Sequence, residues 1–148
     1  MEIRTVEDAA KLLESVHHFH DGYIQTVILS SEDRFDISEP TLQGIGHLCT
    51  GAFRAELIFV HHPTIAGLPP RRKTSRCTFL EVRNFRLDLR HFQEVEWAIQ
   101  DVRIDSDSAG SRLNLRCTWP RLSFNGQWTT RTEHLFSFSR AFVEEECP

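Results

Sequence analysis

The residues best suited to chemistry gather between positions 17 and 22, in the run His-His-Phe-His-Asp-Gly. Imidazole is a common ligand of transition metals, and neutral His nitrogens bind zinc, copper, iron and nickel. In an extended chain His18 and His20 would project to the same side, because alternate residues share a face. Adding His61 from a later strand as a third ligand gives one hypothesis, a metal-dependent enzyme built on a β-sandwich.

The same run is also typical of a polar turn that joins a helix to a strand. Asp side chains in such turns accept backbone N–H bonds, and Gly adopts conformations that other residues avoid. Under this alternative Asp21 stabilises the turn and Gly22 supplies its backbone freedom. We therefore expect no resident cofactor.

Other chemical motifs are weak or missing in the sequence. The basic run Arg71-Arg72-Lys73 has no interleaved aromatic residues, and the chain carries a net charge of −4. An acidic chain is not attracted globally to a polyanion, so we expect no nucleic-acid partner. The sequence also contains no P-loop, nucleophile elbow, dinucleotide fingerprint or zinc-protease helix.

Two features suggest contact with another molecule. One is an acidic segment after the first predicted strand, which could meet a protein partner or be a solvated loop only. The other is Trp128, the tryptophan that we expect to be exposed, which also supports an alternative as a ligand- or sugar-binding β-sandwich. The acidic candidates are Glu32, Asp33, Asp36 and Glu39.

Composition indicates one globular domain spanning residues 1–148. Eleven Phe against a single Tyr indicate a core rich in rings without polar groups. No two cysteines have the C-x-x-C spacing, so we expect Cys49, Cys77 and Cys117 to be small buried hydrophobes. The sequence has no run long enough to span a membrane and no apolar leader, so we expect a cytoplasmic protein.

The cleanest strand signal lies between Arg112 and Trp119, where apolar and polar side chains alternate with a period of two. Such strands recur about every ten to twelve residues, with turn signals between them. A helix is predicted over Thr5–Val16, with Thr5 and Asp8 as a capping pair. The predicted fold is mainly β (α+β), an antiparallel β-sandwich or open barrel of roughly seven to nine strands with one short N-terminal helix.

Several details of this sandwich follow from the pattern. Tyr23–Leu29 soon becomes apolar on both faces, which predicts a central strand. A phase change after Cys77 predicts a bulge or break at Arg83-Asn84. Asn125-Gly126 predicts a hairpin turn, with a loop longer than two residues as one option. The last strand is predicted over His134–Val143, with three rings in phase: Phe136, Phe138 and Phe142.

Three segments resemble one known family. They are Phe19–Ile24, Thr78–Leu87 and Ile99–Ile104. Together they are similar to the immunity proteins of bacterial polymorphic-toxin systems numbered fifty in that scheme, and to their uncharacterised relatives. The resemblance implies a small bacterial binding protein that neutralises a cognate toxin by protein–protein contact, and it brings no catalytic residues. We therefore expect a binding protein, and we leave open a homodimer formed through an exposed strand edge.

Overall fold

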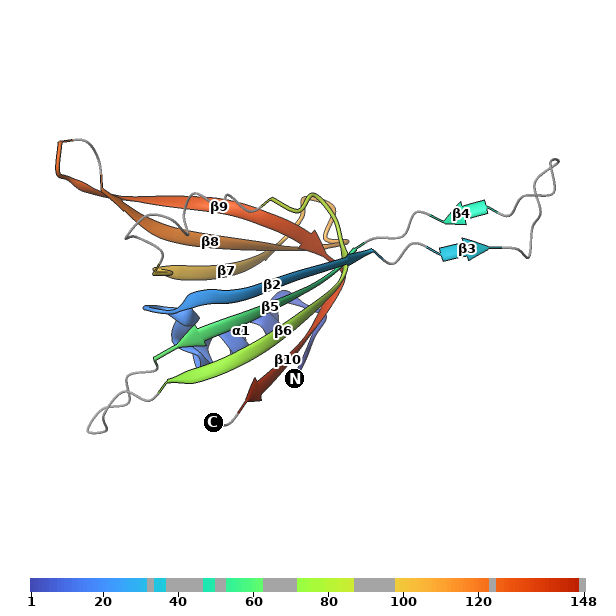
Figure 1. The fold of residues 1–148 in the computed structure, drawn as a ribbon, viewed down its shortest axis with the longest axis horizontal. Coiled ribbons are helices and arrows are strands. Elements are labelled where there is room, and N and C mark those ends of the chain that lie inside the picture. Colours follow the sequence, from blue (N-terminus) through green and yellow to red (C-terminus); the bar gives the residue numbers. More distant parts are fainter. Residues whose placement is uncertain are drawn as a thin grey trace.

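The structure is a computed structural model that describes residues 1–31, 34–36, 47–49, 53–62, 72–86, 98–122 and 125–146. It is mainly β, with two antiparallel sheets, one short α-helix and a separate two-stranded ribbon (Figure 1). The predicted α+β class and antiparallel sandwich-like architecture are thereby confirmed.

The larger sheet has five strands in the order β1-β10-β6-β5-β2. The smaller sheet has three strands in the order β7-β8-β9, and β3 pairs with β4 in the ribbon. The bounds are β1 (Glu2–Ile3), β2 (Tyr23–Ser31), β3 (Arg34–Asp36), β4 (His47–Cys49), β5 (Phe53–His61), β6 (Lys73–Val82), β7 (Asp101–Ser106), β8 (Leu113–Leu122), β9 (Trp128–Phe138) and β10 (Arg140–Glu146).

Helix α1 (Val6–Ser15) begins with the predicted capping box. The backbone N–H of Asp8 donates to Thr5 Oγ1 at 3.1 Å, and the N–H of Thr5 donates to Asp8 Oδ2 at 3.2 Å. The helix turns its buried side chains toward β7 and β1, so that it fills the open side of the sandwich. No helix within the described ranges is long and apolar enough to cross a membrane.

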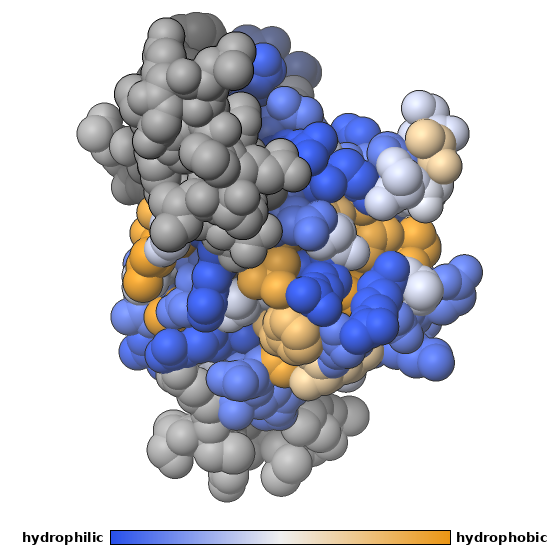
Figure 2. All heavy atoms as spheres, turned by 90° about the vertical axis from the view of Figure 1, so that its right-hand side faces the viewer, coloured by the Kyte–Doolittle hydropathy of each residue, from blue (hydrophilic) through white to orange (hydrophobic). Residues whose placement is uncertain are grey.

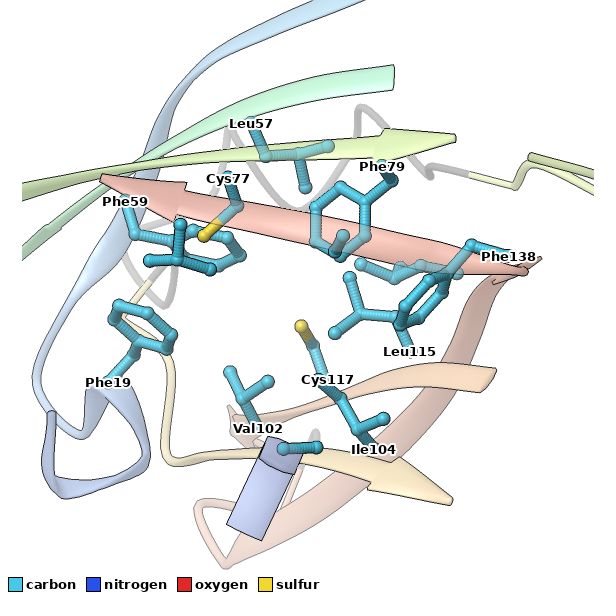
Figure 3. Packing of buried hydrophobic residues seen from close by; sticks show 14 of the residues in the cluster. Phe19, Leu57, Phe59, Cys77, Phe79, Val102, Ile104, Leu115, Cys117 and Phe138 are labelled. Atoms are coloured by element: carbon cyan, nitrogen blue, oxygen red, sulfur yellow. The ribbon is translucent and has the colours of Figure 1, made fainter. Parts of the chain in front are cut away.

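The core lies between the inner faces of the two sheets (Figure 3). On β8 the predicted alternation is confirmed, since Leu113, Leu115, Cys117 and Trp119 are all buried. Phe79 from the larger sheet meets two rings of β9 edge-on, with centroid distances of 4.9 and 5.0 Å to Phe136 and Phe138. Edge-to-face ring pairs add stability beyond the apolar area that they bury.

Two short backbone bridges join the sheets at opposite corners. At one corner the N–H of Ile99 donates to the carbonyl of Gly22 at 2.7 Å. At the other, Arg83 and Ser137 exchange two N–H···O bonds of 2.8 and 3.0 Å. These bridges hold the two sheets in register around one core.

Strand β2 lies at the edge of the larger sheet, so the predicted central position of Tyr23–Leu29 is wrong. Ile28 and Leu29 remain 48% and 43% exposed. A central strand has apolar residues on both faces, and so does an edge strand whose outer face is left uncovered. Periodicity alone therefore could not separate the two positions.

The end of β6 contains both a bulge and the predicted break. Phe79 and Val82 are both buried, which requires an extra residue between them. Opposite Phe53 and Ala55 of β5 the register shifts, and Glu81 has a positive φ of 53°. The bulge before Val82 is additional to the predicted break at Arg83-Asn84, which is confirmed. Strand β6 ends at Val82, Arg83 pairs with Ser137 of the other sheet, and Asn84 has a positive φ of 56°.

The predicted strand over His134–Val143 is two strands in different sheets. The chain leaves β9 at Ser139, whose N–H donates to the carbonyl of Leu80 at 3.1 Å, and continues as β10. Crossing between sheets changes which side chains face inward. Phe136 and Phe138 are buried as predicted, but Phe142 is 37% exposed and was assigned to the wrong face.

Gly22 is required by close packing, and its replacement tests the first corner. A Cβ at this position would lie 2.7 Å from the carbonyl oxygens of both Phe19 and Val60. We expect Gly22→Ala to lower the free energy of unfolding by about 2 kcal/mol or more. Chemical denaturation of Gly110→Ala is the matched control. Gly110 has open space around it but a φ of +66°, so its replacement should cost only about 1 kcal/mol. Equal costs would contradict this account of the corner.

The buried thiols offer a second test. Cys77 and Cys117 are free and point from opposite sheets into the same interior space (Figure 3). Burial raises the pKa of Cys77 to about 12 and also raises the pKa of Cys117. Because the thiolate is the reactive form, neither should be alkylated by iodoacetamide in the folded protein. Peptide mass spectrometry should find both modified only after unfolding, and rapid labelling of either under native conditions would contradict their placement in the core.

Candidate functional site

The histidine-rich turn has an unusual backbone. The 3-10 turn η1 (His17–Phe19) is left-handed, with φ values of 48°, 53° and 54°, and Asp21 also has a positive φ of 58°. Each such residue costs of order 1–3 kcal/mol and persists only where its surroundings hold it. Phe19 stabilises this left-handed backbone, because its side chain is buried and stacks on Phe59 at a centroid distance of 4.4 Å.

This backbone sends the predicted metal ligands in different directions. His18 Nδ1 lies 3.1 Å from Asp101 Oδ1, and His20 Nδ1 lies 3.1 Å from its neighbour Asp21. His61 is 1% exposed on β5, where its Nε2 lies 3.1 Å from Ser75 Oγ. Within the described residues no three His, Cys, Asp or Glu side chains form a group that could hold a metal.

In the polar turn, Asp21 and Gly22 have different roles from those that the sequence predicted. The carboxylate of Asp21 contacts the ring of His20, while its backbone N–H donates to Ile99 at 2.9 Å. Asp21, and not Gly22, takes the left-handed conformation. Gly22 is needed because two carbonyl oxygens occupy the space of a side chain.

His61 is an unusual member of the core. Its ring stands edge-on to Phe19 at a centroid distance of 5.1 Å, and its Nδ1 is buried without a hydrogen-bond partner among the described residues. Burial lowers the pKa of His61, as do the nearby Lys73, His62 and His17, while Glu145 acts in the opposite direction. The imidazole is therefore held in its neutral form.

The depressed pKa predicts acid-sensitive stability. An unfolded histidine has a pKa of about 6.5, so below that pH the unfolded chain binds a proton that the native His61 resists. The free energy of unfolding should fall as the pH drops from 7 to 5, by up to about 1.4 kcal/mol per pH unit for this group. Urea titrations at several pH values would measure the slope.

The matched variants are His61→Leu, which removes the group, and His20→Gln, which replaces an exposed histidine. His61→Leu should flatten the slope, while His20→Gln should retain it. His134 has a pKa lowered by burial and by Arg116, so part of the slope should remain in His61→Leu. An unchanged slope in His61→Leu would contradict the assignment.

The best-connected polar cluster lies on the outer face of the three-stranded sheet. Asn114 donates from Nδ2 to Asp105 at 3.0 Å, and Arg116 Nε donates to the same carboxylate at 2.8 Å. Ser137 Oγ donates to Asn114 Oδ1 at 2.7 Å, and His134 Nε2 lies 3.3 Å from both. The individual residue types gave no sign of this cluster, which requires the pairing of three strands.

This cluster does not form a hydrolase-type relay. The hydroxyl of Ser137 donates to Asn114, and Asp105 contacts Asn114 and Arg116, so no described carboxylate orients the imidazole of His134. A hollow of about 390 Å³ lies beside it, lined by Asn84, Phe85, Arg86, Glu133 and His134. The geometry is that of a hydrogen-bonded network that fixes three strands together.

A two-stranded arm projects from the same sheet. Strand β7 pairs with β8 only as far as Thr118, whereas β8 and β9 continue together to the pair Leu122 and Trp128. Pro120 lies in this extension, where no described strand pairs with the other edge of β8, so a residue without a backbone N–H is tolerated there. The pairing of Leu122 with Trp128 leaves a loop longer than two residues, which was one of the two predicted forms of the Asn125-Gly126 hairpin. We call residues 119–122 and 128–131 the β8–β9 arm.

Trp128 begins the second strand of the arm and is 66% exposed, which confirms its predicted exposure. The acidic candidates are elsewhere. Asp36 lies on β3, opposite His47 of β4, and the ribbon that they form lies at the end of the molecule opposite the start of β9 (Figure 1). The other acidic candidates, Glu32, Asp33 and Glu39, lie outside the described residues. Asp36, the acidic candidate on a described strand, therefore does not lie beside Trp128.

The basic run is partly neutralised. Lys73 Nζ lies 3.5 Å from Glu145, and Arg76 lies 3.3 Å from Glu56 on the neighbouring strand. Arg71 lies outside the described residues.

An exposed apolar surface that the sequence did not reveal lies where β2 ends and β5 begins. Ile28, Leu29 and Phe53 are each more than 40% exposed, and Ile28 borders an open hollow of about 420 Å³. Figure 2 looks at this end of the molecule and shows apolar areas among hydrophilic ones. The missed signal was that β2 contains no charged residue.

Comparisons of this chain with protein-family models, with curated proteins and with solved structures found no match.

Proposed function

We propose that this chain is a small binding protein that acts by protein–protein contact, and that the β8–β9 arm is its main contact. In line with the resemblance of its sequence to polymorphic-toxin immunity proteins, the partner would be a cognate toxin that is neutralised when bound.

The observation that carries this proposal is the exposure of Trp128. Of the large apolar side chains that the structure describes, it has the highest exposed fraction, 66%. Tryptophan is enriched among the residues that dominate binding energy at protein interfaces. An indole held in solvent at the end of a paired arm is suited to insertion into a pocket of a partner.

The arm is rooted in the core and has polar neighbours. Trp119, at its base, is only 4% exposed, so the arm continues directly from a packed strand. Arg131 Nε lies 2.7 Å from Glu133 farther along β9. An apolar centre with a charged rim is the usual composition of a protein interface.

The acidic segment would be a second contact. Its candidates are Glu32, Asp33, Asp36 and Glu39, of which Asp36 lies on β3, and the chain as a whole carries −4. Opposite charge on a basic toxin would speed association more than it would increase affinity. Strand β3, which carries Asp36, and the start of β9 lie at opposite ends of the molecule, so the two contacts would be separate (Figure 1).

A co-expression experiment tests the proposal. The probe is the product of the gene immediately upstream, expressed in a host whose growth it inhibits. The wild-type chain should restore growth, and Trp128→Ala should weaken binding by about 30-fold or more, as loss of an interface hot spot does. Calorimetry with purified proteins gives the affinity. Phe142→Ala, which truncates another exposed aromatic residue, should bind like wild type.

Two results would contradict this assignment. One is an upstream product that neither inhibits growth nor binds the chain. The other is equal binding by wild type and Trp128→Ala, which would remove the arm from the interface.

A second candidate is a ligand- or sugar-binding protein, because an exposed indole is also a stacking platform for a sugar ring. Titration of Trp128 fluorescence against a glycan panel distinguishes the two. A saturable emission shift that is absent in Trp128→Ala would favour the sugar, and a silent panel would exclude it.

A further inference from the structure

The two sheets have four edges, and three of them are protected against pairing with another chain. An unpaired edge is a template for a further strand unless it is short, charged, covered or twisted away. β1 has only two residues, one of them Glu2. β7 is packed against α1 and carries Asp101 and Arg103. β9 carries Arg131 and Glu133.

On the fourth edge, β2, none of the described residues supplies these protections. Its nine residues include no charged side chain and no proline, and no other strand in the described ranges pairs with its outer edge. A bulge interrupts the strand at Gln25, but Thr26–Ser30 pairs regularly with β5. Ile28 and Leu29 in this regular segment are exposed.

The segment Thr26-Val27-Ile28-Leu29-Ser30 is chemically symmetric about its centre. Antiparallel pairing with an identical strand about Ile28 would place Ile28 opposite itself. Val27 would then face Leu29 of the other copy, and Thr26 would face Ser30. Apolar pairs and hydroxyl pairs directly opposite each other stabilise antiparallel ladders. A two-fold axis requires this self-complementarity, because the same surface must serve both subunits.

We propose that β2 pairs with β2 of a second copy of this chain, which forms a homodimer with one continuous sheet. That sheet would have about ten strands, near the upper limit for twisted open sheets. The charges nearest the edge are partly offset within each copy, because Arg54 and Arg76 both contact the carboxylate of Glu56, at 4.0 and 3.3 Å.

The second copy is favoured over an unrelated strand by this symmetry and by the absence of charge. Nothing in a neutral segment of this kind would steer a partner of opposite charge. The edge lies on the larger sheet and the β8–β9 arm belongs to the smaller one, so the two surfaces can be occupied together.

Sedimentation equilibrium of the full chain tests the dimer. The wild type should be dimeric at concentrations of tens of micromolar or more. Ile28→Lys should weaken association on the order of tenfold or more, because two ammonium groups would face each other at the axis. Phe142→Lys is the matched control, since it adds the same charge at a similarly exposed site on β10, and it should leave the dimer intact.

Oxidative cross-linking tests the register and does not depend on whether Ile28→Lys folds. Residues directly opposite in an antiparallel ladder have Cα atoms about 4.5–5.5 Å apart, which is within disulfide range. Ile28→Cys should therefore give a covalent dimer, while Thr26→Cys, which faces Ser30 of the other copy, should not. The wild-type chain, with its four natural cysteines, provides the background.

A wild-type chain that stays monomeric up to about 1 mM would overturn the proposal. So would a dimer that Ile28→Lys leaves unchanged, or cross-linking of Thr26→Cys as efficient as that of Ile28→Cys. Trp128→Ala should retain the dimer, so failure here is distinguishable from failure of the proposed toxin contact.

Discussion

Burial of phenylalanine rings between two sheets is the interaction on which the rest of the structure depends. Phe59 and Phe79 come from the five-stranded sheet, Phe136 and Phe138 from the three-stranded sheet, and all four are 2% exposed or less. Phe19 reaches the same core from the left-handed turn and stabilises a backbone that would otherwise be strained. The corner bridges, the position of α1 and the neutral state of His61 all require this packing.

The core also determines which surfaces remain available for function. Phenylalanine rings, which carry no polar group, fill the interior. On the outer face, the polar cluster around Asn114 links three strands by hydrogen bonds. Among the described residues, the exposed indole of Trp128 and the neutral edge of β2 are not used by folding. These two surfaces are the ones to which we assign contact with other molecules in our proposals.

Sequence reasoning succeeded where one local rule decided the outcome. The period of two identified the buried face of β8, and the Thr5–Asp8 pair identified the start of α1. Sequence reasoning failed where the position of a strand in its sheet determines which side chains are exposed. The apolar faces of β2 did not reveal an edge, and the crossing at Ser139 reversed the face of Phe142. The histidines looked like a ligand set only because a left-handed turn is invisible in sequence.

Native-state hydrogen exchange followed by NMR tests most directly whether one shared core holds both sheets. The slowest amides of β5, β6 and β8 should exchange with the same free energy and the same dependence on denaturant, because they are exposed only by global unfolding. The contradicting result would be exchange of β8 at a free energy several kcal/mol below that of β5 and β6, which would show that the sheets unfold as separate units.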